Sequence, residues 1–570
     1  MFRAEAIVSS LIMVSLVSLM GVVISPWELG QPVEATHGMV VSTNRLASEV
    51  GVEILKKGGN AVDAAVATAF ALAVTFPSAG NIGGGGFMLI RWAKTGRAVV
   101  VDYREEAPGR AERDMYLNEK GEVIPYASTL GYLSIGVPGT VAGLSLALER
   151  YGRMSLPEVM APAIRLAEEG FVVTPSFSRS LERNAPRFSR FPSTRAIFLK
   201  NGKPYQPGEL FCQPDLARTL KLIAKEGPSA FYRGEIARLI VKEMERGGGL
   251  ITLEDLASYK AYIRQPIKGG YRGYEILSVP PPSSGGVALL QLLNILEGFD
   301  LPSMGHNTPE SISLMVEAEK IVYADRAEYL GDPGFVQIPV QGLISKQYAA
   351  DRRKKINLFH ATPSDQIKHG LPPLYESEET THFSVVDRQG NAVANTYTLN
   401  GGYGSKVAVE GAGFLLNNEM DDFSSKPGYP NIYGLIGGEA NAIAPHKRML
   451  SSMTPTILLK DGKLFMVIGT PGGSTIITTV LQVILNVINH RMNIQEAVAA
   501  PRVHHQWTPD LLYIEKDTLP GEVLRALIKR GYQIKERGSI GDAHGILVDP
   551  TTGKLWGGAD PRMDGVAVGY

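Results

Sequence analysis

Apolar residues recur along most of the chain with two different periods. Spacings of three and four residues predict helices at 46–57, 61–74, 157–169, 230–246, 287–296, 311–329 and 476–487. Short apolar or alternating runs predict strands at 87–92, 98–104, 382–387, 392–398, 456–459 and 463–468. The pattern therefore predicts a mixed protein of the α/β or α+β class, but periodicity alone does not choose the order of strands in its sheets.

The N-terminal region has a different pattern. After Arg3, residues 7–24 form an apolar run broken only by serines and one glycine. The run is longer than the apolar core of most export signals and lies at the lower limit of a membrane span. Downstream, Val33 and Ala35 have the spacing that a signal peptidase prefers. We therefore expect residues 1–35 to be a cleaved signal peptide, or alternatively a membrane anchor, of a protein exported to the periplasm or the extracellular space.

Charge and composition exclude several classes of partner and site. The 570 residues include 57 Lys and Arg and 57 Asp and Glu, so the formal net charge is zero, and no block of like charge stands out. This balance argues against a nucleic-acid partner and against polybasic membrane binding. Cys212 is the single cysteine, which excludes an intramolecular disulfide. CxxC and HExxH patterns are absent and His504 and His505 lack zinc-ligand spacing, so we expect neither a metal nor a cofactor.

A connector meets a strand pattern near residue 380. Residues 360–379 contain prolines, a glycine and several glutamates, which is typical of an exposed loop. Thr380 follows Glu379 directly at the start of the strand pattern. A threonine hydroxyl is a weak nucleophile, but cleavage before Thr380 would free an α-amine with a pKa of about 7.7–8.0, which could act as its base. By periodicity alone, the same residues would form an ordinary strand edge.

Two glycine-rich turns allow more than one interpretation. Gly472-Gly473-Ser474 follows a strand and opens a helix, so its backbone N–H groups could stabilise an anion, although an ordinary tight turn fits as well. The run 80–86 lacks the Lys-Ser/Thr of a phosphate loop and follows a helix rather than a strand. We interpret this second turn as a place of close backbone packing.

Several sequence blocks together resemble one protein family. Residues 380–387, which read TTHFSVVD, resemble the start of the small subunit of bacterial-type γ-glutamyltransferases, also called glutathione hydrolases or γ-glutamyltranspeptidases. Further family blocks occur in order at 83–88, 102–105, 137–143, 417–423, 450–455 and 470–474. The resemblance spans nearly all of residues 37–570. It implies an N-terminal-nucleophile hydrolase fold, which is a four-layer αββα sandwich.

The resemblance further implies that the chain cuts itself between Glu379 and Thr380. Residues 36–379 would form a large subunit and residues 380–570 a small subunit, and the two would associate as a heterodimer that builds one intertwined domain. Thr380 would then attack the γ-glutamyl amide of glutathione or a related donor. The γ-glutamyl-enzyme formed in this way would be released by water or by an amino acid or peptide acceptor.

The resemblance also assigns the residues that bind the substrate head group. That head group carries one ammonium and one carboxylate, so its site needs partners of both signs. The expected carboxylate ligands are Arg104, Ser451 and Ser452, and the expected ammonium ligands are Asn400, Glu419 and Asp422. Glu419 stands where many bacterial members of the family carry Gln.

The remaining roles implied by the resemblance concern the reaction itself. Gly472 and Gly473 would form the oxyanion hole through their backbone N–H groups. Thr398, at the end of the second predicted strand after the cleavage point, would orient Thr380. Tyr433, in the segment 427–434 that resembles a lid loop, would cover the bound glutamyl group and exclude water.

Two rival functions share parts of this pattern. A cephalosporin or glutaryl acylase-like amidase would use the same fold and the same self-cleavage, but its acyl group has no α-ammonium, so Glu419 and Asp422 argue against it. A non-catalytic exported binding protein on the same scaffold would not need Thr380, Thr398 or the Gly472-Gly473 pair. Self-cleavage and a comparison of γ-glutamyl with glutaryl substrates separate the three.

Overall fold

The computed structural model describes residues 30–372 and 383–570. Most of the predicted signal peptide or anchor, and the predicted cleavage site at Glu379 and Thr380, lie outside the described residues. Within the described ranges, no helix has both the length and the hydropathy that crossing a membrane requires.

Two seven-stranded sheets form the centre of the molecule, and all neighbouring strands in them are antiparallel. The first sheet has the order β1 (Val33–Ala35), β20 (Leu555–Ala559), β19 (His544–Val548), β15 (Lys463–Gly469), β14 (Thr456–Lys460), β11 (Tyr274–Ser278), β10 (Ile267–Tyr271). The second has the order β21 (Val566–Gly569), β2 (Met39–Ser42), β12 (Phe383–Val386), β13 (Ala392–Thr398), β3 (Gly85–Arg91), β4 (Ala98–Tyr103), β9 (Tyr262–Arg264). The end of the predicted export segment, Val33–Ala35, thus pairs along a sheet edge.

The two sheets pack face to face through one apolar layer. Phe87 and Val100 of the second sheet belong to the same buried cluster as Ile457 and Ile546 of the first. Strands that alternate inward and outward side chains give each sheet a second apolar face, which needs cover of its own.

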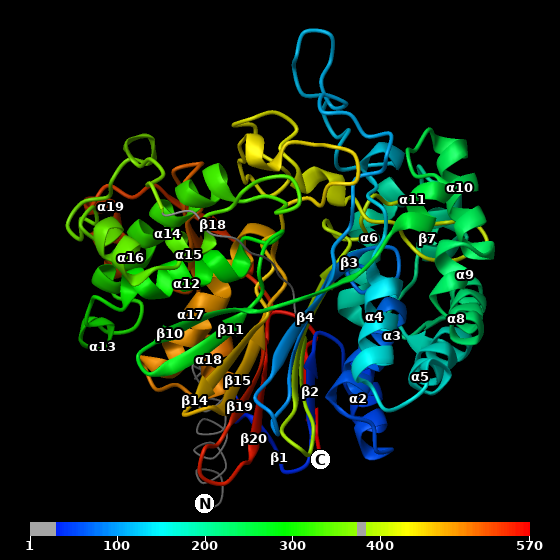
Figure 1. Cartoon of the computed structure of the whole chain (residues 1–570), viewed down its shortest axis with the longest axis horizontal. Helices are drawn as coiled ribbons and strands as arrows, with labels where there is room; N and C mark the ends of the chain where they lie inside the picture. Colours follow the sequence, from blue (N-terminus) through cyan, green and yellow to red (C-terminus); the bar gives the residue numbers. More distant parts are fainter. Residues whose placement is uncertain (1–29, 373–382) are drawn as a thin grey trace, which may run out of the picture.

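Helices provide that cover on both outer faces (Figure 1). Against the first sheet lie α12 (Gly285–Leu296), α13 (Leu301–Met304), α14 (Pro309–Tyr329), α15 (Val340–Leu343), α16 (Lys346–Arg353), α17 (Ile476–Ile488), α18 (Ile494–Ala499) and α19 (Gly521–Lys529). On the side of the second sheet lie α2 (Arg45–Lys56), α3 (Ala61–Thr75), α4 (Thr140–Tyr151), α5 (Leu156–Glu169), α6 (Pro175–Phe188), α7 (Pro192–Phe198), α8 (Pro214–Glu226), α9 (Pro228–Tyr232), α10 (Glu235–Gly247) and α11 (Leu253–Ser258).

Helix α3 illustrates how local sequence fixes these elements. The Asn60 side chain accepts hydrogen bonds from the backbone N–H groups of Val62 and Asp63, and the Asp63 carboxylate accepts one from the Asn60 N–H. Every residue from Ala61 to Thr75 is buried, because the helix is apolar all round and lies between sheet and helices. The helix predicted at 61–74 is confirmed.

The helix predicted at 230–246 is wrong as a single element. The chain forms α9 and then α10, with a break at Arg233 and Gly234. Glycine is costly within a helix because it loses the most backbone freedom on folding, so the helix is interrupted at Gly234. The apolar spacing continues on both sides of this break, and for that reason the pattern predicted one helix.

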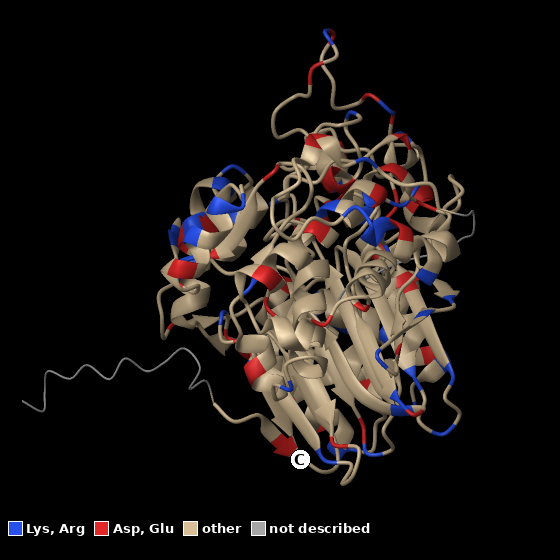
Figure 2. Cartoon of the chain, turned by 90° about the vertical axis from the view of Figure 1, so that its left-hand side faces the viewer, with Lys and Arg blue, Asp and Glu red and all other residues tan. Residues whose placement is uncertain are grey.

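The strand register brings several chain segments to one end of the second sheet. Thr398, the last residue of β13, pairs with Gly85 of β3, and Gly86 pairs with Tyr103 at the end of β4. The chain segments that follow β13 and β4 therefore start side by side. Figure 1 shows the loops of residues 400–450, in yellow, above this end of the sheets. On the face shown in Figure 2, Lys and Arg are interspersed with Asp and Glu, with no division into a basic and an acidic half.

Candidate functional site

A cavity of about 800 Å³ lies at this end of the sheets. It collects most of the residues that the sequence predicted for one site, although these residues come from five separate segments of the chain. The predicted residues that line it are Thr398, Asn400, Glu419, Asp422, Tyr433, Ser451, Ser452, Gly472 and Gly473. Thr380 and Glu379 lie outside the described residues, and Arg104 reaches the cavity through its contacts with Glu419 and Asp422.

The glycine turn at the start of α17 can only be built from glycine. Gly472 has φ 143° and Gly473 has φ 59°, both in the range that side chains disfavour. A Cβ on Gly473 would lie 2.4 Å from the Tyr433 ring, and one on Gly472 would lie 2.5 Å from Thr475 Oγ1. Among the described residues, none accepts a hydrogen bond from either amide N–H. Two donors at the edge of a cavity can stabilise an anion there.

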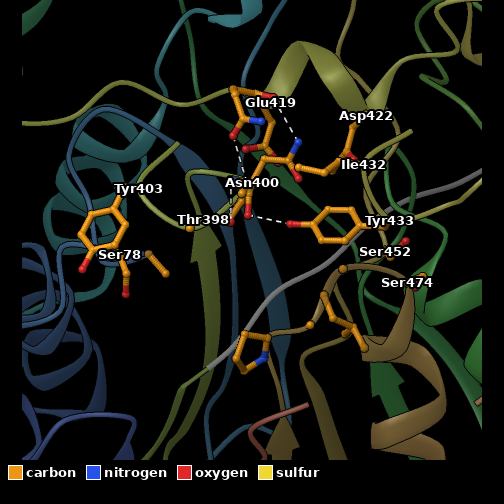
Figure 3. A pocket seen from close by; sticks show the side chains of 18 of the residues that line it. Ser78, Thr398, Asn400, Tyr403, Glu419, Asp422, Ile432, Tyr433, Ser452 and Ser474 are labelled. Atoms are coloured by element: carbon orange, nitrogen blue, oxygen red, sulfur yellow. Dashed lines mark hydrogen bonds between the residues drawn. The ribbon is translucent and has the colours of Figure 1, made fainter. Parts of the chain in front are cut away.

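Thr398, Asn400 and Tyr433 form a chain of contacts across the middle of the cavity. The Asn400 backbone N–H donates to Thr398 Oγ1 at 2.8 Å, and the Asn400 side chain donates to the Asn418 carbonyl at 3.0 Å. The Tyr433 hydroxyl donates to the Asn400 carbonyl at 2.7 Å, as Figure 3 shows. This bond holds the Tyr433 ring beside the glycine turn, where it forms part of the cavity wall.

The segment that carries Tyr433 is also tied to the acidic residues. Asn431 donates to Asp422 at 3.1 Å, and the Ile432 N–H donates to Asp421 at 2.9 Å. Asp421 and Asp422 belong to the short helix η4 (Glu419–Asp422). The loop and the acidic helix therefore form one connected unit.

Arg104 is the centre of a buried charge cluster. It follows β4 and is fully buried. Its guanidinium donates to Glu419 and, at 2.6 Å, to Asp422, and its Nε donates to the Met449 carbonyl at 3.1 Å. Glu105 lies 3.5 Å from the same guanidinium. The resemblance implied that Arg104 binds the carboxylate of a ligand and that the two acidic residues bind its ammonium. It did not imply that Arg104 and the acidic residues contact one another directly, as they do in this structure.

Burial raises the pKa of each carboxyl in this cluster. The pKa of Glu105 rises to about 7, and the pKa values of Glu419 and Asp422 also lie above their ordinary range. In each case the loss of water outweighs the attraction of Arg104. Burial lowers the pKa of Arg104, but Glu419, Glu105 and Asp422 together raise it further, so the guanidinium stays charged. Arg326 also acts to lower the pKa of Asp422, and Arg448 that of Glu105, but burial outweighs these guanidinium groups. An added cation would therefore stabilise the charged form of these carboxyls.

Arg326 contributes a second cation that the sequence pattern did not single out. It lies on α14, is buried, and donates to Ser284 at 2.8 Å and to Ser452 at 3.1 Å. Ser451 is held by its neighbours through the backbone, since its N–H donates to the Pro282 carbonyl at 2.8 Å. In the sequence, Arg326 falls in the last turn of a helical pattern, where an arginine commonly lies on the surface, and no local signal distinguishes it.

The cavity therefore has two chemically different ends. The acidic end consists of Glu419, Asp422, Tyr433, Ser451 and Ser452, backed by Arg104 and Arg326. The basic end consists of Ser180, Arg183, Arg187, Tyr403 and Lys406, to which the sequence assigned no role. No helix was predicted from the sequence at 175–188, so the spacing of Ser180, Arg183 and Arg187 by three and four residues was a signal left unused.

The described parts of the chain contain no group of three or more His, Cys, Asp or Glu arranged to hold a metal ion. His504 and His505 are buried, and burial lowers the pKa of His504 to about 3 and that of His505 to about 4, so both are neutral. His504 contacts Thr478 and Gln506, and His505 contacts Asp510. Both histidines thus form hydrogen bonds with neighbouring protein side chains, as is typical of histidines with a structural role.

Comparison with known proteins identifies families and structures that this chain resembles. A family model described as Gamma-glutamyltranspeptidase matches residues 47–570. The chain is 51% identical over 541 residues to the glutathione hydrolase proenzyme of Escherichia coli (strain K12), covering 95% of this chain and 93% of that protein.

Two solved structures are similar as well. One is a cephalosporin acylase from Bacillus halodurans, with a TM-score of 0.85, 31% identity and coverage of 95% of this chain and 97% of that one. The other is a Helicobacter pylori gamma-glutamyltranspeptidase chain, with a TM-score of 0.57, 45% identity and coverage of 60% and 96%. The family match and the identity along almost the whole chain establish that this protein belongs to the gamma-glutamyltranspeptidase family.

Proposed function

We propose that this chain is a self-processing γ-glutamyltransferase that acts on glutathione and related γ-glutamyl amides. The observation that carries the proposal is the acidic end of the cavity, where one buried guanidinium is paired with Glu419 and Asp422 beside the glycine turn. A γ-glutamyl group ends in a head group with one ammonium and one carboxylate, and a site with charges of both signs suits it.

The proposed fold is an N-terminal-nucleophile hydrolase of the four-layer αββα type, built from two chains. Residues 36–379 would be the large subunit and residues 380–570 the small subunit. The order of the second sheet supports a stable heterodimer after cleavage, because β12 of the later part pairs with β2 of the earlier part and β13 pairs with β3. Cutting the chain would leave these ladders intact.

The strand register supports Thr380 as the nucleophile. Phe383, the first residue of β12, pairs with Asn395 of β13. Position 380 lies three residues before Phe383 in the sequence, and Thr398 lies three residues after Asn395. Thr398 lines the cavity, and this matched distance along the sequence supports Thr380 as the residue whose hydroxyl reacts there.

Self-cleavage would proceed by an acyl shift. Thr380 Oγ attacks the Glu379 carbonyl, the peptide C–N bond breaks, and an ester forms between Glu379 and the Thr380 hydroxyl. Water hydrolyses the ester, leaving a Glu379 carboxylate, a free Thr380 hydroxyl and a free α-amine. That amine has a pKa near neutral and can accept the hydroxyl proton in later turnovers.

The transfer reaction would use the same hydroxyl on the γ-carbonyl of the donor. The backbone N–H groups of Gly472 and Gly473 stabilise the oxyanion that forms. The amide C–N bond breaks, the leaving amine takes a proton, and a γ-glutamyl ester remains on Thr380. Water releases glutamate, whereas the amine of an amino acid or peptide forms a new γ-glutamyl amide.

Head-group binding would exchange partners within the charge cluster. The α-carboxylate takes the place of Asp422 on the Arg104 guanidinium and accepts further hydrogen bonds from Ser451 and Ser452. Asp422, Glu419 and the Asn400 side chain then receive the α-ammonium. The exchange keeps every buried charge paired, which is the condition for a favourable buried ion pair. Tyr433 covers the bound group and excludes water.

The acylase alternative is favoured by one observation, the likeness to the cephalosporin acylase structure. A glutaryl group lacks the ammonium, so binding it would leave Glu419 and Asp422 facing methylene groups at a high desolvation cost. We therefore propose γ-glutamyl amides as the preferred substrates. The N-terminal residues 1–35 would direct export to the periplasm or extracellular space, either as a cleaved signal peptide or as an anchor.

The decisive experiment combines processing with substrate choice. The purified protein should separate into two chains on a denaturing gel, and the smaller chain should begin at Thr380 by N-terminal sequencing. It should hydrolyse glutathione and a γ-glutamyl anilide far faster than a glutaryl anilide. Thr380→Ala should remain one inactive chain, whereas the neighbouring control Thr381→Ala should still be cut before residue 380. A small chain that starts elsewhere, or faster turnover of the glutaryl anilide, would reject the proposal.

A further inference from the structure

The basic end of the cavity is built mainly by one face of α6. Ser180, Arg183, Asn184 and Arg187 line the cavity at spacings of three and four residues, which place them on a single helix face. The neighbouring face of the helix holds Leu181 and Phe188, which are buried. The apolar face fixes the helix against the core, and so the polar face is presented to the cavity as a unit.

Lys406 adds a buried ammonium to this face. Its Nζ donates to the carbonyls of Gly402 and Gly404 at 2.5 and 2.8 Å, and only 7% of the residue is exposed. Burial, with Arg187 nearby, lowers the pKa of Lys406 to about 8. Carbonyl dipoles stabilise the ammonium only in part, and no Asp or Glu of the described ranges forms an ion pair with it.

Tyr403 connects the helix to the reacting part of the cavity. Its hydroxyl and the Ser180 hydroxyl share a hydrogen bond of 2.9 Å, and its backbone N–H donates to the Ser78 carbonyl at 2.7 Å. The Lys406 N–H donates to the Tyr403 carbonyl at 3.1 Å. These contacts tie the three cationic side chains to the chain segment that follows Thr398.

No carboxylate in the described residues neutralises this end. Neither Arg183, Arg187 nor Lys406 forms an ion pair there with an Asp or Glu within residues 30–372 and 383–570. The acidic residues that line the cavity are Glu419 and Asp422 at the other end and Asp542, whose carboxylate accepts a hydrogen bond from Thr43. Three cations that share one face of a cavity attract an anion.

The position of this face identifies which part of the substrate it meets. Figure 3 shows Tyr403 and Ser78 on one side of Thr398, and Tyr433, Ser452 and Ser474 on the other. With the γ-glutamyl head group at the acidic end, the amine part of the scissile amide extends past Thr398 toward Tyr403. Leaving amines that are amino acids or peptides end in a carboxylate.

We infer that Arg183, Arg187 and Lys406 form a subsite for the free carboxylate of the leaving amino acid or peptide, and of the acceptor that replaces it. This inference rests on the proposed function and adds the chemical class of the amine partner. The same cations would serve both half-reactions, because the acceptor amine must approach the γ-glutamyl ester from the side by which the first amine left. The ligand is thus a peptide or amino acid with an unblocked C-terminus.

The test compares three donors that share the γ-glutamyl head group. Glutathione carries the leaving-group carboxylate, glutathione with its glycine carboxyl converted to the carboxamide lacks the charge, and γ-glutamyl-p-nitroanilide has no carboxylate. The variant is Arg183→Gln with Arg187→Gln, and the control is Arg179→Gln, an exposed arginine of the same helix that does not line the cavity. Wild type should prefer glutathione over its carboxamide by about tenfold in kcat/KM.

The double variant should lose that preference by losing activity on glutathione, while its activity on the anilide and its self-cleavage stay unchanged. Arg183→Lys with Arg187→Lys should restore part of the preference, because the charge is kept. In the acceptor reaction, glycylglycine should lose its advantage over glycylglycinamide in the same variant.

Three outcomes would overturn the inference. They are a wild type without preference for the carboxylate donor, a double variant that retains the preference, and equal losses on all three donors. If processed wild-type protein fails to hydrolyse even the anilide, the proposed function itself is rejected, and this result is distinct because it does not depend on the leaving group.

Discussion

The two ends of the cavity hold their charges in opposite ways. At the acidic end, Arg104 is fully buried and its guanidinium is shared between Glu419 and Asp422. At the basic end, Arg183 and Arg187 are exposed on one helix and have no acidic partner among the described residues. One end is a closed set of paired charges, and the other is an open set of like charges.

This difference teaches what each end can contribute to specificity. Charges interact strongly where water is excluded, and removing one partner of a buried pair leaves the other uncompensated. Exposed charges interact weakly and are screened by salt. The acidic end can therefore require a particular head group, whereas the exposed Arg183 and Arg187 of the basic end can only favour one class of amine over another.

Breaking the acidic end at Asp422 should give the largest effect. Asp422→Ala removes the proposed partner of the α-ammonium, so kcat/KM for γ-glutamyl donors should fall by about 100- to 1,000-fold. Any activity on glutaryl anilides should persist or rise, because a carboxylate that faces apolar groups is removed. Both substrates must be measured on the same variant.

The control for Asp422→Ala is self-cleavage, which should persist because the bond before Thr380 is unchanged. Equal proportional losses on γ-glutamyl and glutaryl substrates in a fully processed variant would remove Asp422 from the ammonium site and support the acylase alternative.

Replacing Arg104 by lysine should give the next largest effect. Lysine keeps the charge but cannot donate in parallel to two acceptors, so the variant should lose about 1–3 kcal/mol of donor binding. The loss should appear mainly as a raised KM for both glutathione and the anilide. The matched change Arg187→Lys, at the basic end, should have little effect, because an exposed charge there needs no fixed geometry. A wild-type KM in Arg104→Lys would mean that Arg104 does not hold the carboxylate.

Local sequence predicts those parts of the fold that depend on contacts between residues close together in the chain. The hairpin at 382–387 and 392–398 was predicted from alternation around a turn and is observed as β12 and β13. The pairing of β13 with β3, some 300 residues earlier in the chain, could not be predicted from periodicity, because apolar alternation shows that a strand has a buried face but not which strand lies beside it.

The site shows the same division. Arg104, Asp422 and the glycine pair could be named from family blocks, and the structure gathers them at one cavity. The contact between Arg104 and the two acidic residues could not be named, since each residue was matched to a ligand rather than to its neighbours. Arg326 was missed because an arginine on a predicted helix has the same local pattern whether it faces solvent or a cavity. The basic end was missed because no helix was predicted at 175–188, where Arg183 and Arg187 lie.

The excess of carboxyl groups at the acidic end should also make stability depend on pH. Glu105 has a pKa of about 7 in the folded protein, above its ordinary value near 4.5, so the folded state binds the proton more tightly. Its stabilising contribution is complete below pH ~4.5 and is lost as pH rises through ~7. Glu105→Gln, which resembles the protonated form, should therefore raise Tm by about 1–3 °C at pH 8 and leave it unchanged at pH 4.

The control for this stability effect is Arg183→Gln at the basic end, which should show the same dependence of Tm on pH as wild type. If Glu105→Gln lowers Tm at pH 8, the Glu105 carboxylate is stabilised by Arg104 more than it is destabilised by burial, and the direction of its pKa shift is wrong.

The smallest expected effect is the dependence of KM on salt concentration, and it compares the two ends of the cavity most directly. Raising ionic strength from about 0.05 M to about 0.5 M shortens the screening length from roughly 14 Å to roughly 4 Å. Exposed Arg183 and Arg187 should then attract the leaving-group carboxylate less, and the KM for glutathione should rise by about two- to threefold. The KM for the anilide should stay constant, because this donor shares the head group but not the carboxylate, and the buried pairs at the acidic end are little screened. In Arg183→Gln with Arg187→Gln, the salt dependence for glutathione should disappear. Equal salt effects on both donors would instead locate the salt sensitivity at the acidic end. That result would contradict the conclusion that the buried charges require a particular head group while the exposed arginines only favour a leaving group with a carboxylate.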